Sequence, residues 1–371
     1  EMRLFSGFPR RVKGGGVMKR LTSCAVCALI LLAAAAGAAP PTAGWSPPSS
    51  EVKSCLDALK NACAEGDEAG IARAAGGLRA AWGDAPDFDA IAGAALDRGA
   101  DPKYRWIMID SLVLYKRGVE DAAGARALLS MLDAVSWAGG DDAFVRAKAL
   151  TVEAGMIALF SEKGLIRERA RREFGRRLAA LMEEERDAGL LAAACIAAGR
   201  AGTAEAAPAM RRRLADDGAA PAVRRTAAGA LGRLNDRESI PVIAGVLEKT
   251  PDRRLHGSGA FALGSMGGEE VVEPLVRHAG RFDNGSCANA LRRNRATVRR
   301  MLDDGKGAGT ENAIRAARIA GMKDALPRIT ALENDARPGV RRAAREARDA
   351  LNRALGDPFP GGEPEGGEVK P

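Results

Sequence analysis

The feature that most constrains the fold of this chain is an internal repeat between about residues 188 and 280. Marker glycines lie 33 and 32 residues apart, at Gly199, Gly232 and Gly264. Marker prolines lie 33 and 33 residues apart, at Pro208, Pro241 and Pro274. Two independent markers that keep nearly the same period predict stacked copies of one structural unit.

Each unit is predicted to be a helical hairpin, in which an Ala-rich first helix ends in Gly and a second helix has Pro in its first turn. One apolar stripe with helical spacing follows the first helix after Pro221, at Val223, Ala227, Ala230, Leu231 and Leu234. The second helix has its own stripe at Ile240, Ile243 and Leu247. Asn235-Asp236 supplies the turn between them. Because neither helix can bury its apolar face alone, neighbouring units must stack.

The composition supports an all-α fold, because only 4% of residues are aromatic and Ala, Leu, Gly and Arg dominate. We predict an α-α superhelix with regular repeats over residues 188–355 and a divergent helical N-terminal half over 51–187. Helices in that half are expected at 51–64, 67–82, 86–98, 102–117, 119–137, 141–161 and 163–186.

The repeated unit resembles the bacterial HEAT-like repeats first grouped with phycobilisome lyases, which carry an x-Val-Arg-x-x-Ala-x-x-x-Leu-Gly pattern. The matching residues are Val223-Arg224, Ala227, Leu231-Gly232, Leu255, Gly259, Leu263-Gly264 and, in part, Val340-Arg341. Tetratricopeptide repeats have a similar period but need aromatic residues that this half lacks. The resemblance implies a superhelix used for binding and implies no reaction, since such arrays serve many unrelated tasks.

Residues 18–38 have the organisation of a secretory signal peptide. Met18-Lys19-Arg20 precedes an apolar run, and Ala36-Gly37-Ala38 fits the A-x-A cleavage rule. We expect cleavage after Ala38 and export to the periplasm or the cell exterior. An uncleaved membrane anchor is the alternative, because the apolar run and the small residues after it approach the roughly 20 residues that span a bilayer.

The segments on either side of the predicted helical region have compositions that do not support a packed core. We expect residues 1–17 to be an upstream extension, with Met18 as the start. Residues 39–50 form a Pro/Ser-rich linker and residues 356–371 a Gly/Pro-rich tail. Both are predicted to be disordered.

The basic charge of the chain is concentrated at its beginning. The formal net charge is +8, and residues 1–38 hold six Lys and Arg and one Glu. The remainder carries 50 basic and 47 acidic residues, so the targeting segment accounts for most of the excess. Nucleic-acid binding is therefore disfavoured, although residues 156–371 retain 38 basic against 30 acidic residues.

The residues that usually carry catalysis or metal binding are scarce. The chain has two histidines, and repeat alignment places His256-Gly257-Ser258-Gly259 at ordinary helix positions. Cys55 and Cys63 would lie roughly 12 Å apart on one helix, beyond disulfide reach. We therefore predict no catalytic site, no cofactor and no metal site.

Arginine clusters are the best candidates for a binding site. Anchored on the prolines, Arg211 and Arg277 fall in one column of the second helices, with Arg212 and His278 in the next. The resemblance implies that second helices line the concave face. These residues, together with Arg300, are predicted to form a basic strip for a carboxylate- or phosphate-bearing partner. Local ion pairs with nearby acids are the alternative.

The function predicted from the sequence is an exported, non-enzymatic scaffold that binds an unidentified protein or peptide. Binding of nucleic acid or another polyanion through the Arg-rich surface is the alternative. A lyase-like enzyme ranks third, because no group of residues supports it.

Overall fold

The computed structural model describes residues 50–82, 88–113, 119, 121–279, 284–305 and 309–356. Regular structure in these ranges is entirely helical, which confirms the predicted all-α class. The predicted extension at 1–17, the signal peptide at 18–38 and nearly all of the linker and tail lie outside the described residues. Within the described ranges, no helix is both long and apolar enough to cross a membrane. The chain divides into two compact units, the first ending at Arg167 and the second beginning at Glu168.

The first unit consists of helical hairpins. Its described helices are α2 (Ser50–Glu65), α3 (Glu68–Trp82), α4 (Phe88–Leu96), α5 (Pro102–Ser111), α6 (Ala122–Ser136) and α7 (Ala143–Glu162). Helix α2 packs on α3, α4 on α5, and α6 on α7; α4 also packs on α6, and α5 on α7. The helices fall close to the ranges predicted from the apolar periodicity.

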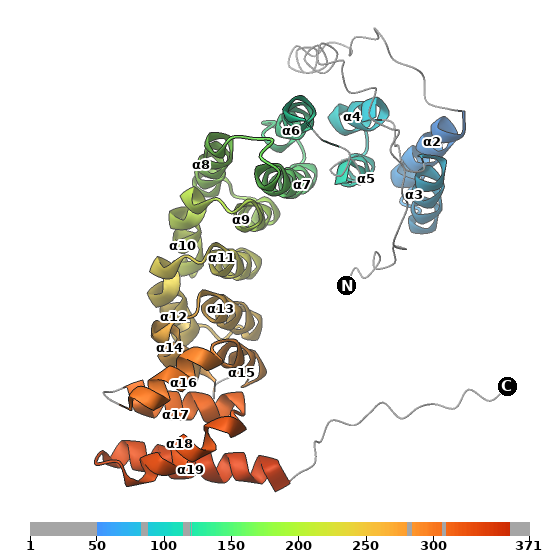
Figure 1. Ribbon diagram of the computed structural model, residues 1–371. Helices are drawn as coiled ribbons and strands as arrows, with labels where there is room; N and C mark the ends of the chain where they lie inside the picture. Colours follow the sequence, from blue (N-terminus) through green and yellow to red (C-terminus); the bar gives the residue numbers. More distant parts are fainter. Residues whose placement is uncertain are drawn as a thin grey trace, which may run out of the picture. The chain divides into compact units, whose positions relative to one another are not determined.

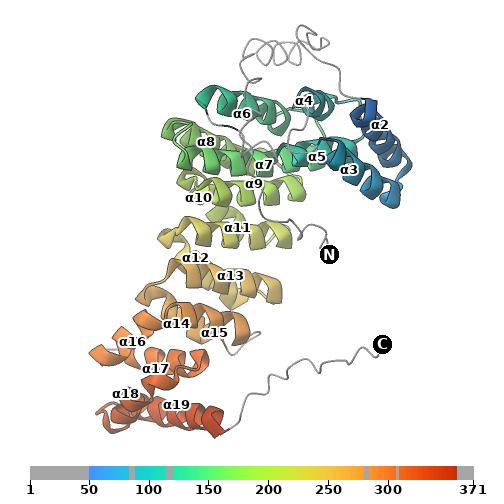
Figure 2. The same ribbon diagram turned by 45° about the vertical axis from the view of Figure 1, so that its right-hand side comes forward.

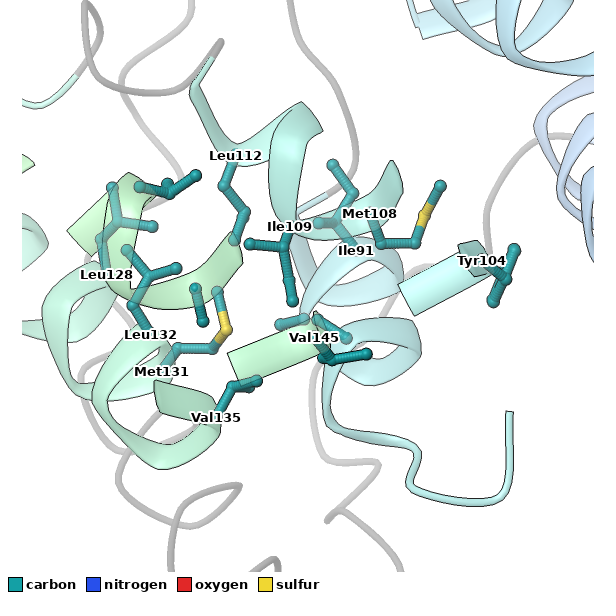
Figure 3. Close-up of a cluster of buried hydrophobic side chains, with 14 of the residues drawn as sticks. Ile91, Tyr104, Met108, Ile109, Leu112, Leu128, Met131, Leu132, Val135 and Val145 are labelled. Carbon is teal, nitrogen blue, oxygen red and sulfur yellow. The ribbon is translucent and has the colours of Figure 1, made fainter. Parts of the chain in front are cut away.

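Figure 3 shows part of the buried core of this unit, where side chains of α4, α5, α6 and α7 meet. Ile91 of α4, Met108 and Ile109 of α5, Leu132 of α6 and Val145 of α7 are all buried there. Burial of large aliphatic side chains from successive helices is what holds such hairpins together, since each helix offers only one apolar face.

The second unit is a two-layered stack of hairpins. Its helices are α8 (Glu168–Glu184), α9 (Ala188–Ala201), α10 (Ala207–Ala215), α11 (Pro221–Leu234), α12 (Ile240–Lys249), α13 (Arg253–Met266), α14 (Val272–His278), α15 (Asn284–Arg293), α16 (Arg295–Asp304), α17 (Gly309–Ala320), α18 (Leu326–Ala331) and α19 (Pro338–Gly356). Figures 1 and 2 show α9, α11, α13 and α15 in one layer and α8, α10, α12 and α14 in the other.

Glycines inside the first helices allow neighbouring helices to approach backbone to backbone. An added Cβ would lie 3.0 Å from Ala230 Cα at Gly199, 2.5 Å from Ala262 Cα at Gly232, and 2.6 Å from Ala290 Cβ at Gly264. The marker glycines therefore serve the contacts of α9 with α11, α11 with α13, and α13 with α15. The sequence pattern predicted that these glycines end the helices, and this prediction was wrong. The helices end further on, before Gly202, Asn235 and Gly267, which have positive φ.

Three arginines form the same hydrogen bond near the start of a helix. The guanidinium Nε donates to a last-turn carbonyl of the preceding helix, from Arg105 to Ala95 (3.0 Å), Arg146 to Ser136 (3.3 Å) and Arg224 to Leu214 (3.0 Å). Carbonyl groups in the last turn of a helix lack hydrogen-bond partners within that helix. They also carry the negative end of the helix dipole, which a nearby cation stabilises. Because two of the three arginines belong to the first unit, that unit keeps this feature of the repeat although its sequence period is poor.

Helix α8 belongs to the second unit, whereas the sequence pattern assigned it to the N-terminal half. It packs on α9 and α10. Arg213 of α10 donates to the carbonyl of Met182 near the end of α8, at 2.6 Å. Gly175 of α8 lies so close to Thr203 that an added Cβ would be 2.7 Å from its Cβ. These contacts explain why the boundary falls before residue 168.

Candidate partner-binding surface

Two arginines of the predicted strip lie on α10, and each faces a carboxylate. Arg211 lies 2.7 Å from Glu238 and 3.1 Å from Asp236, which belong to the next hairpin. Arg212 pairs with Glu183 of α8 at 2.6 Å. Burial raises the pKa of Asp236 even though the charge of Arg211 acts to lower it. Both arginines are thus engaged in ion pairs between neighbouring hairpins.

The other two arginines of the predicted strip are also matched by acids. Arg277 of α14 pairs with Glu248 of α12 and with Glu273 of its own helix. The pKa of Arg277 is raised, most strongly by its hydrogen bond to Glu248 and to a smaller extent by its hydrogen bond to Glu273. Arg300 of α16 lies 3.3 Å from Glu269. The structure therefore places acids beside all four arginines, which is the ion-pair alternative considered from the sequence.

His278 does not lie on the exposed surface with the arginines, because its side chain is only 2% exposed. Successive residues of a helix point about 100° apart, so the neighbour of the exposed Arg277 points inward. The ring of His278 meets that of His256 edge to face, with centroids 6.1 Å apart. His256 itself lies inside α13, and its Nε2 is 3.2 Å from the carbonyl oxygen of Thr250. Both histidines therefore belong to the interior of the stack.

A groove of about 700 Å³ lies between α14, α17 and α19. Its lining residues are Glu273, Val276, Arg277, Ala279, Asn312, Arg315, Arg318, Ile319 and Ala350. Three guanidinium groups from two helices therefore border one opening, together with a patch of aliphatic side chains. Of the strip residues predicted from the sequence, only Arg277 lines this groove.

The three arginines of the groove differ in how firmly they are engaged. Arg277 is exposed and shares its charge with two exposed glutamates. Arg315 pairs with Glu311 one turn earlier on α17. The guanidinium group of Arg318 is exposed and has no hydrogen bond or ion pair with the residues that the structure describes. Exposed ion pairs contribute only about 0–1 kcal/mol, so an incoming carboxylate could compete for Arg277 and Arg315 as well.

Sequence reasoning missed Arg315, Arg318 and Asn312 as surface residues of interest. A usable signal was present for Arg318, since neither Ile314 nor Met322, four residues away on either side, is acidic. An arginine without an acid one turn away has no intrahelical ion pair. The packing of α17 on α14 could not be predicted from the sequence, because it depends on how helices that are separated in the chain contact each other.

Cysteines and possible metal ligands are dispersed in the described part of the chain. No disulfide joins Cys55, Cys63, Cys195 and Cys287. Cys55 and Cys63 lie on the continuous helix α2, as predicted. Burial raises the pKa of Cys63 to about 11 and that of Cys195 to about 12. Among the described residues, no group of three or more His, Cys, Asp or Glu side chains could hold a metal ion.

Comparison with protein families identifies the central repeats. Residues 217–294 match the family described as HEAT repeats. This part of the chain is similar to HEAT repeats. The matched residues contain α11 to α15 and the glycine contacts of Gly232 and Gly264. HEAT repeats generally form non-catalytic helical scaffolds that often mediate protein interactions. No curated protein matches the chain.

Proposed function

We propose that this chain is an exported, non-enzymatic HEAT-like scaffold that binds a protein or peptide partner. The observation that carries the proposal is the match of residues 217–294 to HEAT repeats, within a stack whose first helices touch backbone to backbone. Close contacts of this kind hold exposed side chains from several helices at fixed spacing. A preorganised surface loses little conformational entropy when it binds a partner.

Export is supported by the sequence alone. The basic start at Met18-Lys19-Arg20, the apolar run and Ala36-Gly37-Ala38 together form a signal-peptide pattern. Expression of the chain in a bacterial host and N-terminal sequencing of the envelope fraction would test this part. A mature protein beginning at Ala39 is expected, and a protein retained in the cytoplasm with residues 18–38 intact would refute it.

Partner binding is tested by crosslinking in the native envelope followed by mass spectrometry. The expected result is a reproducible set of crosslinks from lysines of the described helices to one protein, competed by added purified chain. Crosslinks that spread over many abundant proteins without competition would refute a specific scaffold role.

Binding of nucleic acid or another polyanion is the second candidate, favoured by the charge of the second unit. Residues 168–356 contain 35 Lys and Arg against 25 Asp and Glu. Binding to DNA through phosphate contacts would weaken steeply as salt concentration rises. Absent or salt-insensitive binding of the purified chain to a DNA oligomer would eliminate this candidate.

A further inference from the structure

We infer that the α14–α17 groove, lined as described above by α14, α17 and α19, binds an acidic peptide segment of a partner protein. The inference rests on the proposed scaffold function and adds the surface and the chemistry of the partner. It starts from the convergence of Arg277, Arg315 and Arg318 on one opening. Glu273 is the one acidic residue among the described lining residues.

The charges of the groove favour a ligand with carboxylates. Arg318 is exposed and unengaged among the described residues, so it offers its donors directly. Arg315 and Arg277 lie in surface ion pairs, where an incoming carboxylate exchanges one partner for another at little cost. A guanidinium holds a carboxylate through two parallel hydrogen bonds, which sets the orientation of the bound chain. Asn312 adds a neutral side chain that can both donate and accept a hydrogen bond.

The apolar part of the groove favours a peptide over a simple anion. Val276 of α14, Ile319 of α17 and Ala350 of α19 line the same opening, and each of these side chains is partly exposed. An aliphatic or aromatic side chain placed there would remove apolar surface of both partners from water. The ligand that fits is therefore a segment in which acidic residues flank an apolar one.

The same lining disfavours nucleic acid. No aromatic side chain borders the groove among the described residues, so bases would have nothing to stack on. Glu273 would repel a phosphate backbone, which carries a charge at every nucleotide, whereas a peptide can place a neutral residue opposite it. Arg211 and Arg212 of α10 and Arg299 and Arg300 of α16 pair with acids and do not line the groove. These arginines therefore do not extend the groove into a continuous basic track.

The test measures binding of a short fluorescein-labelled peptide of alternating Glu and Leu to the full chain by fluorescence anisotropy. Peptides with Gln or Lys in place of Glu serve as comparisons. Arg318→Glu should weaken binding about tenfold, because it replaces a donor with a like charge. Arg233→Glu is the matched control, since Arg233 is an exposed arginine of α11 outside the groove. Ile319→Ser should weaken binding of the same peptide through the apolar contact.

Support would be tight binding of the Glu peptide alone, lost in Arg318→Glu and kept in Arg233→Glu, with unchanged far-UV circular dichroism. Equal losses in both variants would overturn the inference, because they would indicate attraction to overall charge. Tighter binding of a single-stranded DNA probe that depends on Arg318, or self-association that disappears in Arg318→Glu, would also overturn it. If a competed crosslinked partner maps away from the groove, the scaffold function stands and this inference fails.

Discussion

Neighbouring arginines on α10 make two different kinds of contact. Arg213 donates to the carbonyl oxygens of Met182 (2.6 Å) and Glu183 (3.4 Å), at the end of α8. Arg212 instead pairs with the carboxylate of Glu183, and both of these side chains are exposed. The first contact satisfies helix-end carbonyls that have no intrahelical partner, whereas the second joins two exposed side chains and is screened by water.

We therefore expect Arg213→Met to lower the free energy of unfolding by about 1–2 kcal/mol, as for loss of a hydrogen bond to a charged group. Arg212→Met should change it by less than about 0.5 kcal/mol. Urea unfolding followed by far-UV circular dichroism would measure both variants. Equal effects would show that the carbonyl contact contributes no more than a surface ion pair.

The Arg105–Asp141 pair makes the stability of the first unit depend on pH. Both side chains are almost fully buried, at 2% and 4% exposure, and their hydrogen bonds measure 2.6 and 2.8 Å. Burial acts to raise the pKa of Asp141, but hydrogen bonds from Arg105 and from the backbone N–H of Asp142 outweigh it, and the pKa is lowered. A lowered folded-state pKa stabilises the fold above the unfolded value near 4, and this stabilisation is lost as pH falls further.

Asp141→Asn should cost about 3 kcal/mol at pH 7, because it leaves the buried guanidinium without its counter-charge. The difference between this variant and the wild type should shrink as pH falls below about 4, where Asp141 itself becomes protonated. Urea unfolding at several pH values, followed by tryptophan fluorescence, would test this. A difference that stays constant down to pH 2 would contradict the assignment.

At the scale of the helix, apolar periodicity predicted element positions well but not element contacts. The stripe from Val223 to Leu231 identifies α11, because burial on one face repeats with the helical turn. The role of Gly232 in the contact between α11 and α13 was not predicted. A glycine near the end of a helix pattern is normally interpreted as the helix terminus, and the sequence does not show which helix packs against it. The predicted surface position of His278 was wrong for a related reason. A shift of one residue in the alignment of the second helices moves a side chain from the surface to the core.

Two glycines of α11 provide a matched test of backbone contact. Gly232→Ala should destabilise the second unit by about 1–3 kcal/mol, because its Cβ would lie 2.5 Å from Ala262 Cα. Gly229 has open space around it, so Gly229→Ala should stabilise by about 0.5–1 kcal/mol through helix propensity alone. Urea midpoints from far-UV circular dichroism would compare them. Stabilisation by both changes would show that α11 and α13 can move apart without cost.

At the scale of the whole molecule, the two units can be followed separately. The tryptophans all precede the boundary at residue 167, at Trp45, Trp82, Trp106 and Trp137. Tryptophan fluorescence therefore reports on the first unit, whereas far-UV circular dichroism reports on helices of both. Each unit has its own buried core, which permits separate unfolding.

Gly232→Ala should accordingly shift the circular dichroism transition and leave the fluorescence midpoint unchanged. Asp141→Asn should shift the fluorescence midpoint at pH 7, because its buried pair belongs to the first unit. Unfolding of one sample monitored by both signals would test this. Coincident transitions that move together in both variants would mean that the molecule unfolds as one cooperative unit.

The glycine contacts also bear on how such a chain lengthens during evolution. Each glycine contact joins a glycine of one helix to an alanine of the next. Helix α11 has both residues, Ala230 in contact with the preceding helix and Gly232 in contact with the following one, and α13 repeats this with Ala262 and Gly264. A duplicated copy inserted between them would find a complementary neighbour on each side without a new contact having to arise. Helix α15 keeps the receiving alanine, Ala290, but has Arg292 where α11 and α13 have glycine, so it does not offer the same backbone contact to a further helix.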